Sequence, residues 1–263
     1  MSMATSQERA DFWDQISALY PLVKNRTRSY ADVKPALQRI IDGEFDTAST
    51  TDGRNNLFVS PTTQIGNLKR WNDEFNLGIP KKWFDQLGAP PEVPTEPLVV
   101  VTLVPYLKGK RGVSGVQRTF DALWAIAASR QPNSRRGPRM LSDDKHLRLL
   151  FGIEHEPGLH WEIIDLGASQ GKAPRRYTTA DSSHAGVLAT AAHHPEYVQS
   201  QNGNDVPYLW LSGYQVNRGG EDPWRGVPYL SWRQVSRKVQ LYVDWDGVPD
   251  PRYAVPVLRG VQH

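Results

Sequence analysis

A proline-rich stretch, residues 89–97, divides the chain into two parts with different hydrophobic patterns. It has four prolines in nine residues, and proline lacks the N–H that a helix interior or a central strand needs. Before it, apolar residues recur at helical spacing, whereas after it the runs are typical of strands. The stretch therefore predicts an extended linker between a helical region, residues 1–88, and a mixed α/β domain, residues 98–263.

The helical spacing recurs four times before the linker. Apolar residues follow it over residues 8–20 and 31–41. Ser60 followed by Pro61 has the form of an N-cap and a first helical residue, so a third helix is expected to begin there. A short fourth helix is expected over residues 81–87.

After the linker the pattern predicts both strands and helices. Residues 98–104 form a nearly continuous β-branched run, which is typical of a strand buried on both faces. Further elements are expected as helices at 114–129, 142–151 and 183–198, a strand at 161–166, and strands in VPYLWL, VPYLSW, KVQLYVDW and YAVPVL. The two VPYL segments suggest two similar strand starts in one sheet. The expected fold is α+β or α/β, with a helical N-terminal segment and a mixed sheet domain that ends in antiparallel strands.

Composition limits the chemistry and the compartment. The 263 residues include no cysteine, which excludes disulfides, thiolate metal sites and cysteine nucleophiles. The N-terminus has no apolar signal-peptide core, and the longest apolar run is far below the ~20 residues that span a bilayer. We therefore expect a cytoplasmic protein with no membrane partner.

The charge is uneven along the chain, whose net charge is +3. Residues 97–183 carry 13 basic and 8 acidic side chains, a difference of +5. This indicates a local basic patch and not the strongly basic balance of a dedicated nucleic-acid binder.

A set of segments after the linker stands out together: PLVVVTLVPYL, GVSGVQRTFDALW, HLRLLFGIEH, WEIIDLGA, HAGVLATAAHHPEYV, VPYLWLSGYQV and VPYLSW. The set resembles a family of hypothetical proteins from uncultured candidate-phylum bacteria, over about residues 97–258. The resemblance implies a bacterial origin. That family has no known activity, cofactor or catalytic residue, so the resemblance implies no chemistry.

Four histidines are candidates for a metal site. His155 and His160 enclose the sequence EPGL and superficially resemble the zincin motif, but that motif needs histidines four apart on one helix. Here the spacing is five, and the intervening Pro and Gly favour a turn. His193 and His194 could join them only through the fold. We therefore expect neither a metal nor another cofactor.

The catalytic hypothesis that the sequence offers is a hydrolase triad. Ser114, Asp165 and His184 occur in the chain order of an α/β-hydrolase triad, with His155 and His160 as further candidates. A loop separates Ser114 from the preceding strand, so the sharp turn of a nucleophile elbow is missing. The simpler interpretation is that Ser114 caps a helix.

Basic loops and an aromatic C-terminal part favour binding. Arginine forks suit phosphate groups, and the candidate binding arginines are Arg111, Arg135, Arg136, Arg139, Arg175 and Arg176. Nine Tyr and Trp residues fall within residues 208–253. Alternation along 239–245 predicts that Trp245 lies in the core and that Tyr242 is an exposed contact residue. Core and interface packing is the competing explanation of this aromatic load.

Three function classes remain open from the sequence. The first is a binding or interaction module that uses the basic loops and the aromatic sheet, with nucleic acid or another protein as partner. The second is a hydrolase that depends on histidines and carboxylates or on a metal. The third is a structural or assembly protein, for which a homo-oligomer is one form.

Overall fold

The computed structural model describes residues 57–131, 133–150, 156–174, 185–219, 223–247 and 249–259. The helices expected at 8–20 and 31–41 lie outside these residues. So do four candidate site residues: His155, Arg175, Arg176 and His184.

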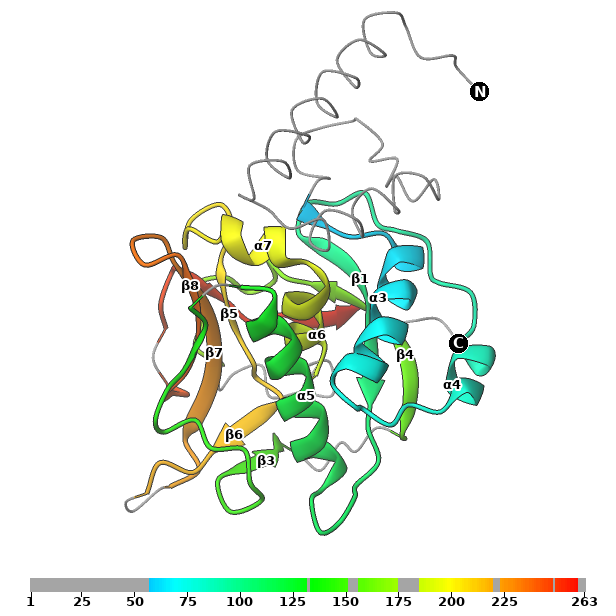
Figure 1. Ribbon diagram of the computed structural model, residues 1–263. Helices are drawn as coiled ribbons and strands as arrows, with labels where there is room; N and C mark the ends of the chain where they lie inside the picture. The colour runs from blue at the N-terminus through cyan, green and yellow to red at the C-terminus, as the bar shows by residue number, and fades with distance from the viewer. Residues whose placement is uncertain are drawn as a thin grey trace, which may run out of the picture. The chain divides into compact units, whose positions relative to one another are not determined.

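The described elements combine helices with two sheets, so the fold is α+β (Figure 1). The helices are α3 (Pro61–Glu74), α4 (Lys81–Gln86), α5 (Gly115–Ser129), α6 (Gly186–His193) and α7 (Pro195–Ser200). The strands are β1 (Val99–Tyr106), β2 (Arg135–Arg136), β3 (Leu147–Leu149), β4 (Gly158–Asp165), β5 (Tyr208–Trp210), β6 (Tyr214–Val216), β7 (Gly226–Arg233), β8 (Lys238–Trp245), β9 (Tyr253–Ala254) and β10 (Val257–Arg259).

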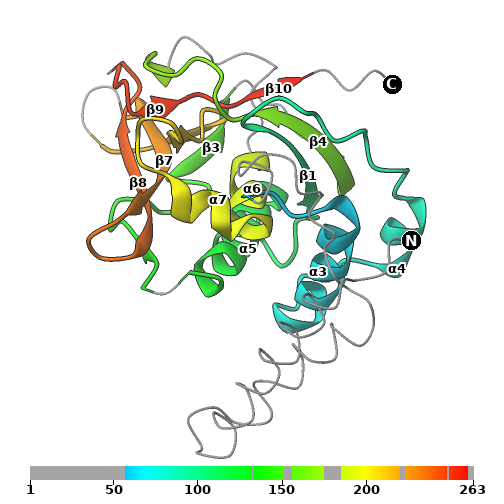
Figure 2. The same cartoon turned by 90° about the horizontal axis from the view of Figure 1, so that it is seen from above.

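The smaller sheet has the order β1-β4-β10. The long strands β1 and β4 pair antiparallel, from Val99 opposite Asp165 to Tyr106 opposite Gly158. All eight residues of β1 are buried, which confirms the strand expected from the β-branched run. Helices α3 and α6 pack against β1 (Figure 2).

The larger sheet has the order β2-β8-β7-β5-β9, and β6 joins β7 to β3. Its centre is the β7–β8 hairpin. Strand β5 pairs antiparallel with β7 and parallel with β9. The two VPYL segments thus lead into neighbouring strands, with Leu209 opposite Leu230 as expected for two similar strand starts in one sheet.

Helices α5, α6 and α7 lie between the two sheets (Figures 1 and 2). Helix α6 is buried along its whole length, and its sequence GVLATAAH is apolar on nearly every side, as a helix enclosed by other elements requires. Main-core residues come from both sheets and from the helices between them. One face of the larger sheet is therefore covered by helices.

The proline-rich stretch forms neither helix nor strand over residues 87–95. On its N-terminal side, Leu68 and Trp71 of α3 and Trp83 of α4 belong to the same hydrophobic core as the sheets. The described part of region 1–88 therefore packs with the domain that follows. A separate N-terminal region stays a prediction for residues 1–56.

Two expected helices differ from the structure. The helix expected at 142–151 is wrong: residues 143–146 form a single turn, and β3 then pairs with β6. The helix expected at 183–198 is interrupted at His194, because the residue before a proline is disfavoured in the α conformation. Pro195 then opens α7, where its missing N–H costs nothing.

Candidate functional site

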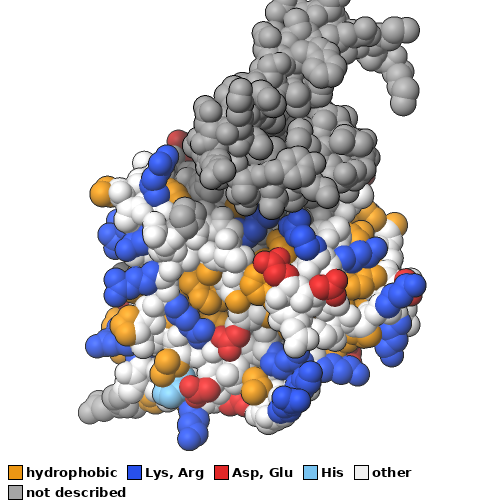
Figure 3. All heavy atoms as spheres, in the orientation of Figure 1, with side chains coloured by type: hydrophobic (Ala, Val, Ile, Leu, Met, Phe, Trp, Pro, Cys, Tyr) orange, Lys and Arg blue, Asp and Glu red, His pale blue; other side chains and the backbone are white. Residues whose placement is uncertain are grey.

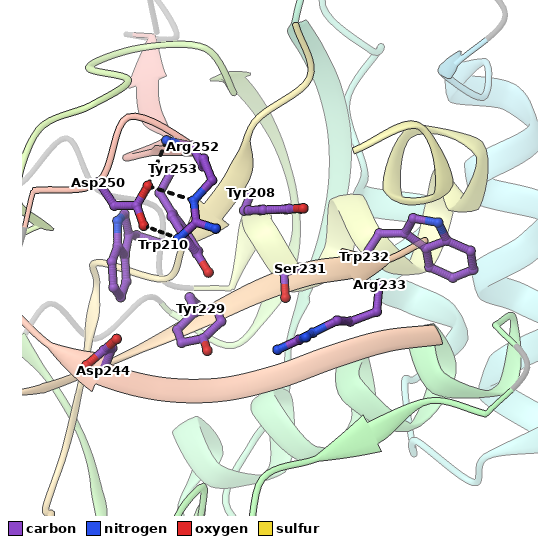
Figure 4. A pocket seen from close by; sticks show the side chains of 10 residues that line it. All are labelled: Tyr208, Trp210, Tyr229, Ser231, Trp232, Arg233, Asp244, Asp250, Arg252 and Tyr253. Carbon is purple, nitrogen blue, oxygen red and sulfur yellow. Dashed lines mark hydrogen bonds and ion pairs between the residues drawn. The ribbon is translucent and has the colours of Figure 1, made fainter. Parts of the chain in front are cut away.

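A cleft lies on the face of the larger sheet that points away from the helices (Figure 4). The alternation of β7 creates this division. Leu230 and Trp232 pack in the main core, whereas Tyr229, Ser231 and Arg233 point to the opposite face. The cleft has a volume of about 320 Å³, which is in the range of ligand sites. We call it the aromatic cleft.

Four aromatic rings form the floor of the aromatic cleft. The ring of Tyr253 lies 5.0 Å from Trp210, 5.2 Å from Tyr208 and 5.2 Å from Tyr229, measured between centroids. Trp210 meets Tyr229 at 5.5 Å in an edge-on arrangement. These separations are typical of favourable aromatic pairs.

Strand pairing brings these rings together from distant parts of the sequence. The antiparallel register places Trp210 opposite Tyr229, and the parallel register places Tyr208 opposite Tyr253. Val227 and Val255 pack with Trp210 in a small hydrophobic cluster that is separate from the main core. The floor therefore has its own apolar support on this face, while the three tyrosines are only half-buried.

Charged side chains line the rim. Arg252 donates two hydrogen bonds to Asp250, Nε to Oδ1 at 3.0 Å and Nη2 to Oδ2 at 2.7 Å. These bonds lower the pKa of Asp250, so the carboxylate stays charged. Arg233 donates from Nε to Gln240 Oε1 at 2.8 Å, and Asp244 lies toward the other end of β7 and β8.

Tyr229 and Tyr253 of the cleft are neutral at physiological pH. Burial raises the pKa of Tyr229, and the nearby Asp244 raises it further. Burial also raises the pKa of Tyr253. The cleft can therefore offer flat faces for stacking, neutral hydroxyl groups for hydrogen bonds and charged groups at its rim.

Tyr242, expected as an exposed contact residue, lies half-buried beside the aromatic cleft. Its ring is stacked on Tyr229 with the centroids 6.3 Å apart. On its other side it covers Gly137, where a Cβ atom would lie only 2.9 Å from the ring. The predicted face of β8 that Tyr242 shares with Gln240 and Asp244 is thus the face of the cleft.

Trp245, expected in the core, is instead 40% exposed. It is the last residue of β8 and lies opposite Gly226, which has no side chain to cover it. The guanidinium of Arg218 lies 4.4 Å from its ring centroid, as in a cation–π pair. Trp245 lies on the apolar face of β8 as predicted, but at the end of the strand this face is no longer covered by the core.

The predicted binding arginines have different environments. Arg135 pairs in register with Gln240 and therefore belongs to the face of the cleft, where it is exposed. Arg136 points the other way and forms an ion pair with Asp121 at 2.8 Å. Arg139 is exposed in the following loop. Of these three, only Arg135 lies on the face of the candidate site.

Arg111 is at the tip of a tight turn. Lys110 and Val113 exchange backbone hydrogen bonds, and Arg111 and Gly112 between them have positive φ values of 53° and 80°. Positive φ at both central residues makes this a turn of the I′ kind. Helix α5 begins just after this turn, and its N-cap Ser114 already donates a hydrogen bond to the carboxylate of Asp144 at 2.6 Å.

Ser114 and Asp165 are not brought together. Ser114 is the N-cap of α5, as the simpler interpretation held, and accepts from the backbone N–H of Gln117. Asp165 accepts from Arg259 at 2.9 Å and lies opposite Val99, at the start of β1. Ser114 follows the other end of this eight-residue strand, which is roughly 23 Å long at 3.3 Å per step.

His160 lies on one face of the small sheet with a buried carboxylate. Its ring meets Tyr106 edge-on at 5.3 Å, and its Nε2 hydrogen-bonds the backbone oxygen of Glu156. The hydroxyl of Tyr106 donates to Glu162, which is buried. In the described residues, His160 is thus linked to the carboxylate of Glu162 on β4 through the ring of Tyr106.

His193 and His194 are fully buried and serve the backbone. His193 donates from Nε2 to the carbonyl oxygen of Leu103 at 3.1 Å, and His194 accepts at Nδ1 from the N–H of Val59 at 2.7 Å. Burial lowers the pKa of His193 to about 3 and that of His194 well below its usual value, so both are neutral. Within the described ranges, no group of three or more His, Asp or Glu side chains could hold a metal.

Several cleft residues were not singled out from the sequence, among them Arg233, Asp244, Asp250 and Arg252. For Arg233 a signal existed, because alternation along VPYLSWR separates Tyr229, Ser231 and Arg233 from the apolar set. Asp250 and Arg252 come from the turn before β9 and reach the cleft through a parallel pairing with β5. Local patterns do not reveal that pairing.

Comparison with protein-family models, with curated proteins and with solved structures finds no match for this chain. The resemblance noted in the sequence therefore stays a prediction. None of the described helices combines the length and the apolar character needed to cross a bilayer.

Proposed function

We propose that this protein is a binding module that holds a ring-bearing ligand in the aromatic cleft. One observation carries the proposal. One face of the larger sheet packs in the main core, yet the other face gathers four aromatic rings into a cleft with a charged rim, with the ring of Tyr242 stacked beside them. Half-buried tyrosines on a sheet are suited to stacking bases or sugars.

The hydrolase hypothesis has weaker support. The serine of the proposed triad is a helix cap, and it lies far from Asp165 along β1. His193 and His194 are neutral groups that bond to the backbone. The cleft, by contrast, offers the stacking faces, hydroxyl groups and charges that ligand binding needs. Among its described residues, no nucleophile is in contact with a base.

Tyr229 gives the sharpest test, because its ring is central to the floor. We expect Tyr229→Ala to weaken the binding of a ring-bearing ligand by about tenfold or more, the equivalent of roughly 1.4 kcal/mol. Tyr229→Phe keeps the ring and should bind nearly as the wild type does. Tryptophan fluorescence can follow titrations with nucleotides, oligonucleotides and neutral oligosaccharides, because Trp210 contacts Tyr229.

Thermal unfolding of both variants serves as the control for folding. The proposal is wrong if no ligand class binds the wild type, or if binding is the same in Tyr229→Ala.

A further inference from the structure

Arg233 is a cation in the aromatic cleft that no described acid neutralises. Its Nε donates to the neutral amide of Gln240, and the ion pairs among the described residues do not involve it. Its side chain runs along the cleft toward Tyr229 (Figure 4). Arg252 differs, because both of its bonding edges engage Asp250. Arg233 therefore has nitrogen donors left for an anionic ligand.

The basic character continues beyond the cleft. Lys238 lies opposite Arg233, and Arg135 lies opposite Gln240, so both share the face of the cleft. On this face the four cations Arg135, Arg233, Lys238 and Arg252 exceed the two acids Asp244 and Asp250 by two. Arg237 adds a further cation at the exposed hairpin tip. Figure 3 shows Lys and Arg side chains along the margin where Figure 1 places β7 and β8.

Asp244 marks the opposite end of the cleft. It lies opposite Val227, four residues along β7 from Ser231, a distance of about 13 Å along the strand. Its side chain is 53% exposed, and its Oδ1 lies 3.7 Å from Arg218 and accepts from the N–H of Trp245 at 2.8 Å. The exposed carboxylate can accept a further hydrogen bond from a ligand at Oδ2. Carboxylates accept from the amino groups of nucleobases. The cleft thus has a hydrogen-bond acceptor at one end, rings in the middle and a free arginine toward the other end.

We propose that the ligand is single-stranded nucleic acid, with an unpaired base stacked in the aromatic cleft and a neighbouring phosphate bound by Arg233. This proposal rests on the proposed function. Neutral sugars need no free cation, whereas a phosphate does. A base in a duplex has both faces covered by its neighbours, so only an unpaired base can enter the floor of rings. The rest of the nucleic-acid chain can then pass along the cations Lys238, Arg135 and Arg237.

Fluorescence anisotropy tests this with the full chain and a labelled oligonucleotide about eight nucleotides long, single-stranded or as a duplex. We expect the single strand to bind more tightly than the duplex. Tyr229→Ala should weaken binding by about 5- to 150-fold, as the loss of one stacked base does. Arg233→Gln should reduce the slope of log K against log salt by about 0.7, as the loss of one phosphate contact does.

Arg70→Gln is the matched control, because Arg70 is an exposed arginine of α3 that bonds Asn67. It should bind as the wild type does. Equal binding of single strand and duplex, or unchanged binding in Tyr229→Ala, would overturn the inference.

The same titration with neutral oligosaccharides separates the two proposals. If they bind in a Tyr229-dependent manner and oligonucleotides do not, the nucleic-acid inference fails and the binding module stands. If no ligand depends on Tyr229, both fail.

Discussion

At the scale of single residues, Gln64 carries an unusual share of the fold. It is fully buried, and its amide donates to the carbonyl oxygen of Val101 and accepts from the N–H of Leu103, both at 2.8 Å. Strand β1 is at the edge of its sheet, so these groups have no neighbouring strand. The side chain of α3 therefore substitutes for a strand and prevents unsatisfied backbone groups in the core.

We expect Gln64→Leu to lower the free energy of unfolding by about 2–5 kcal/mol, because it leaves two buried backbone groups without partners. Urea unfolding followed by circular dichroism measures this. Thr62→Leu places the same residue at an exposed position of the same helix and should change stability by less than about 0.5 kcal/mol. Equal effects of the two substitutions would contradict the role of the amide.

The same scale shows what alternation can and cannot reveal. The face of Tyr242 was predictable, because period two is a local property of β8. The exposure of Trp245 was not, because it depends on Gly226 in the partner strand. The free state of Arg233 depends likewise on which acids the fold brings near it. The sheet face that a side chain occupies can therefore be predicted from the sequence, whereas the residues that surround it are set by the register between strands.

At the scale of elements, two helical glycines meet different surroundings. A Cβ atom on Gly66 of α3 would have no neighbour within 4 Å, whereas one on Gly115 of α5 would lie 2.5 Å from the backbone oxygen of Leu107. Glycine also costs a helix roughly 0.5–1 kcal/mol relative to alanine, through the entropy of the unfolded chain. Substitution at Gly66 therefore tests helix propensity alone, whereas substitution at Gly115 also tests the packing around the added Cβ atom.

We expect Gly66→Ala to raise the free energy of unfolding by about 0.5–1 kcal/mol. Gly115→Ala should lower it by about 1–3 kcal/mol, because the clash is with backbone that cannot rotate away. Chemical denaturation of the two variants gives both values. A stabilising Gly115→Ala would show that the turn before α5 can shift.

Element types were predictable where local signals agreed. Ser60 with Pro61 and Ser114 each opened a helix as expected, because caps act within a few residues. The segment 142–151 failed because its turn resembles the start of a helix, while pairing of β3 with β6 decides the structure. The aromatic cleft shares this origin, since β5 and β9 meet through a long-range parallel pairing.

At the scale of the whole molecule, the buried histidines connect pH to stability. The pKa of His193 is lowered to about 3 by burial, with Arg130 adding to the effect, and that of His194 is lowered by burial and by His193. In the unfolded chain a histidine has a pKa near 6.5. Below this pH the unfolded state binds protons that the folded state does not, so stability falls as pH falls.

We expect each of these histidines to contribute a loss of about 1.4 kcal/mol per pH unit once the pH is below 6.5 and above the folded pKa. The lowered pKa of Asp250 adds a loss only at more acidic pH, because its unfolded carboxyl titrates near 4. Urea midpoints measured between about pH 6.5 and 5 therefore isolate the histidines. His193→Gln should be less stable at every pH in this range. The slope of its free energy of unfolding against pH should be smaller by about 1.4 kcal/mol per unit, since glutamine cannot bind the proton. An identical slope in the variant and the wild type would mean that His193 is protonated in the folded protein, in conflict with its burial among apolar groups at the edge of β1.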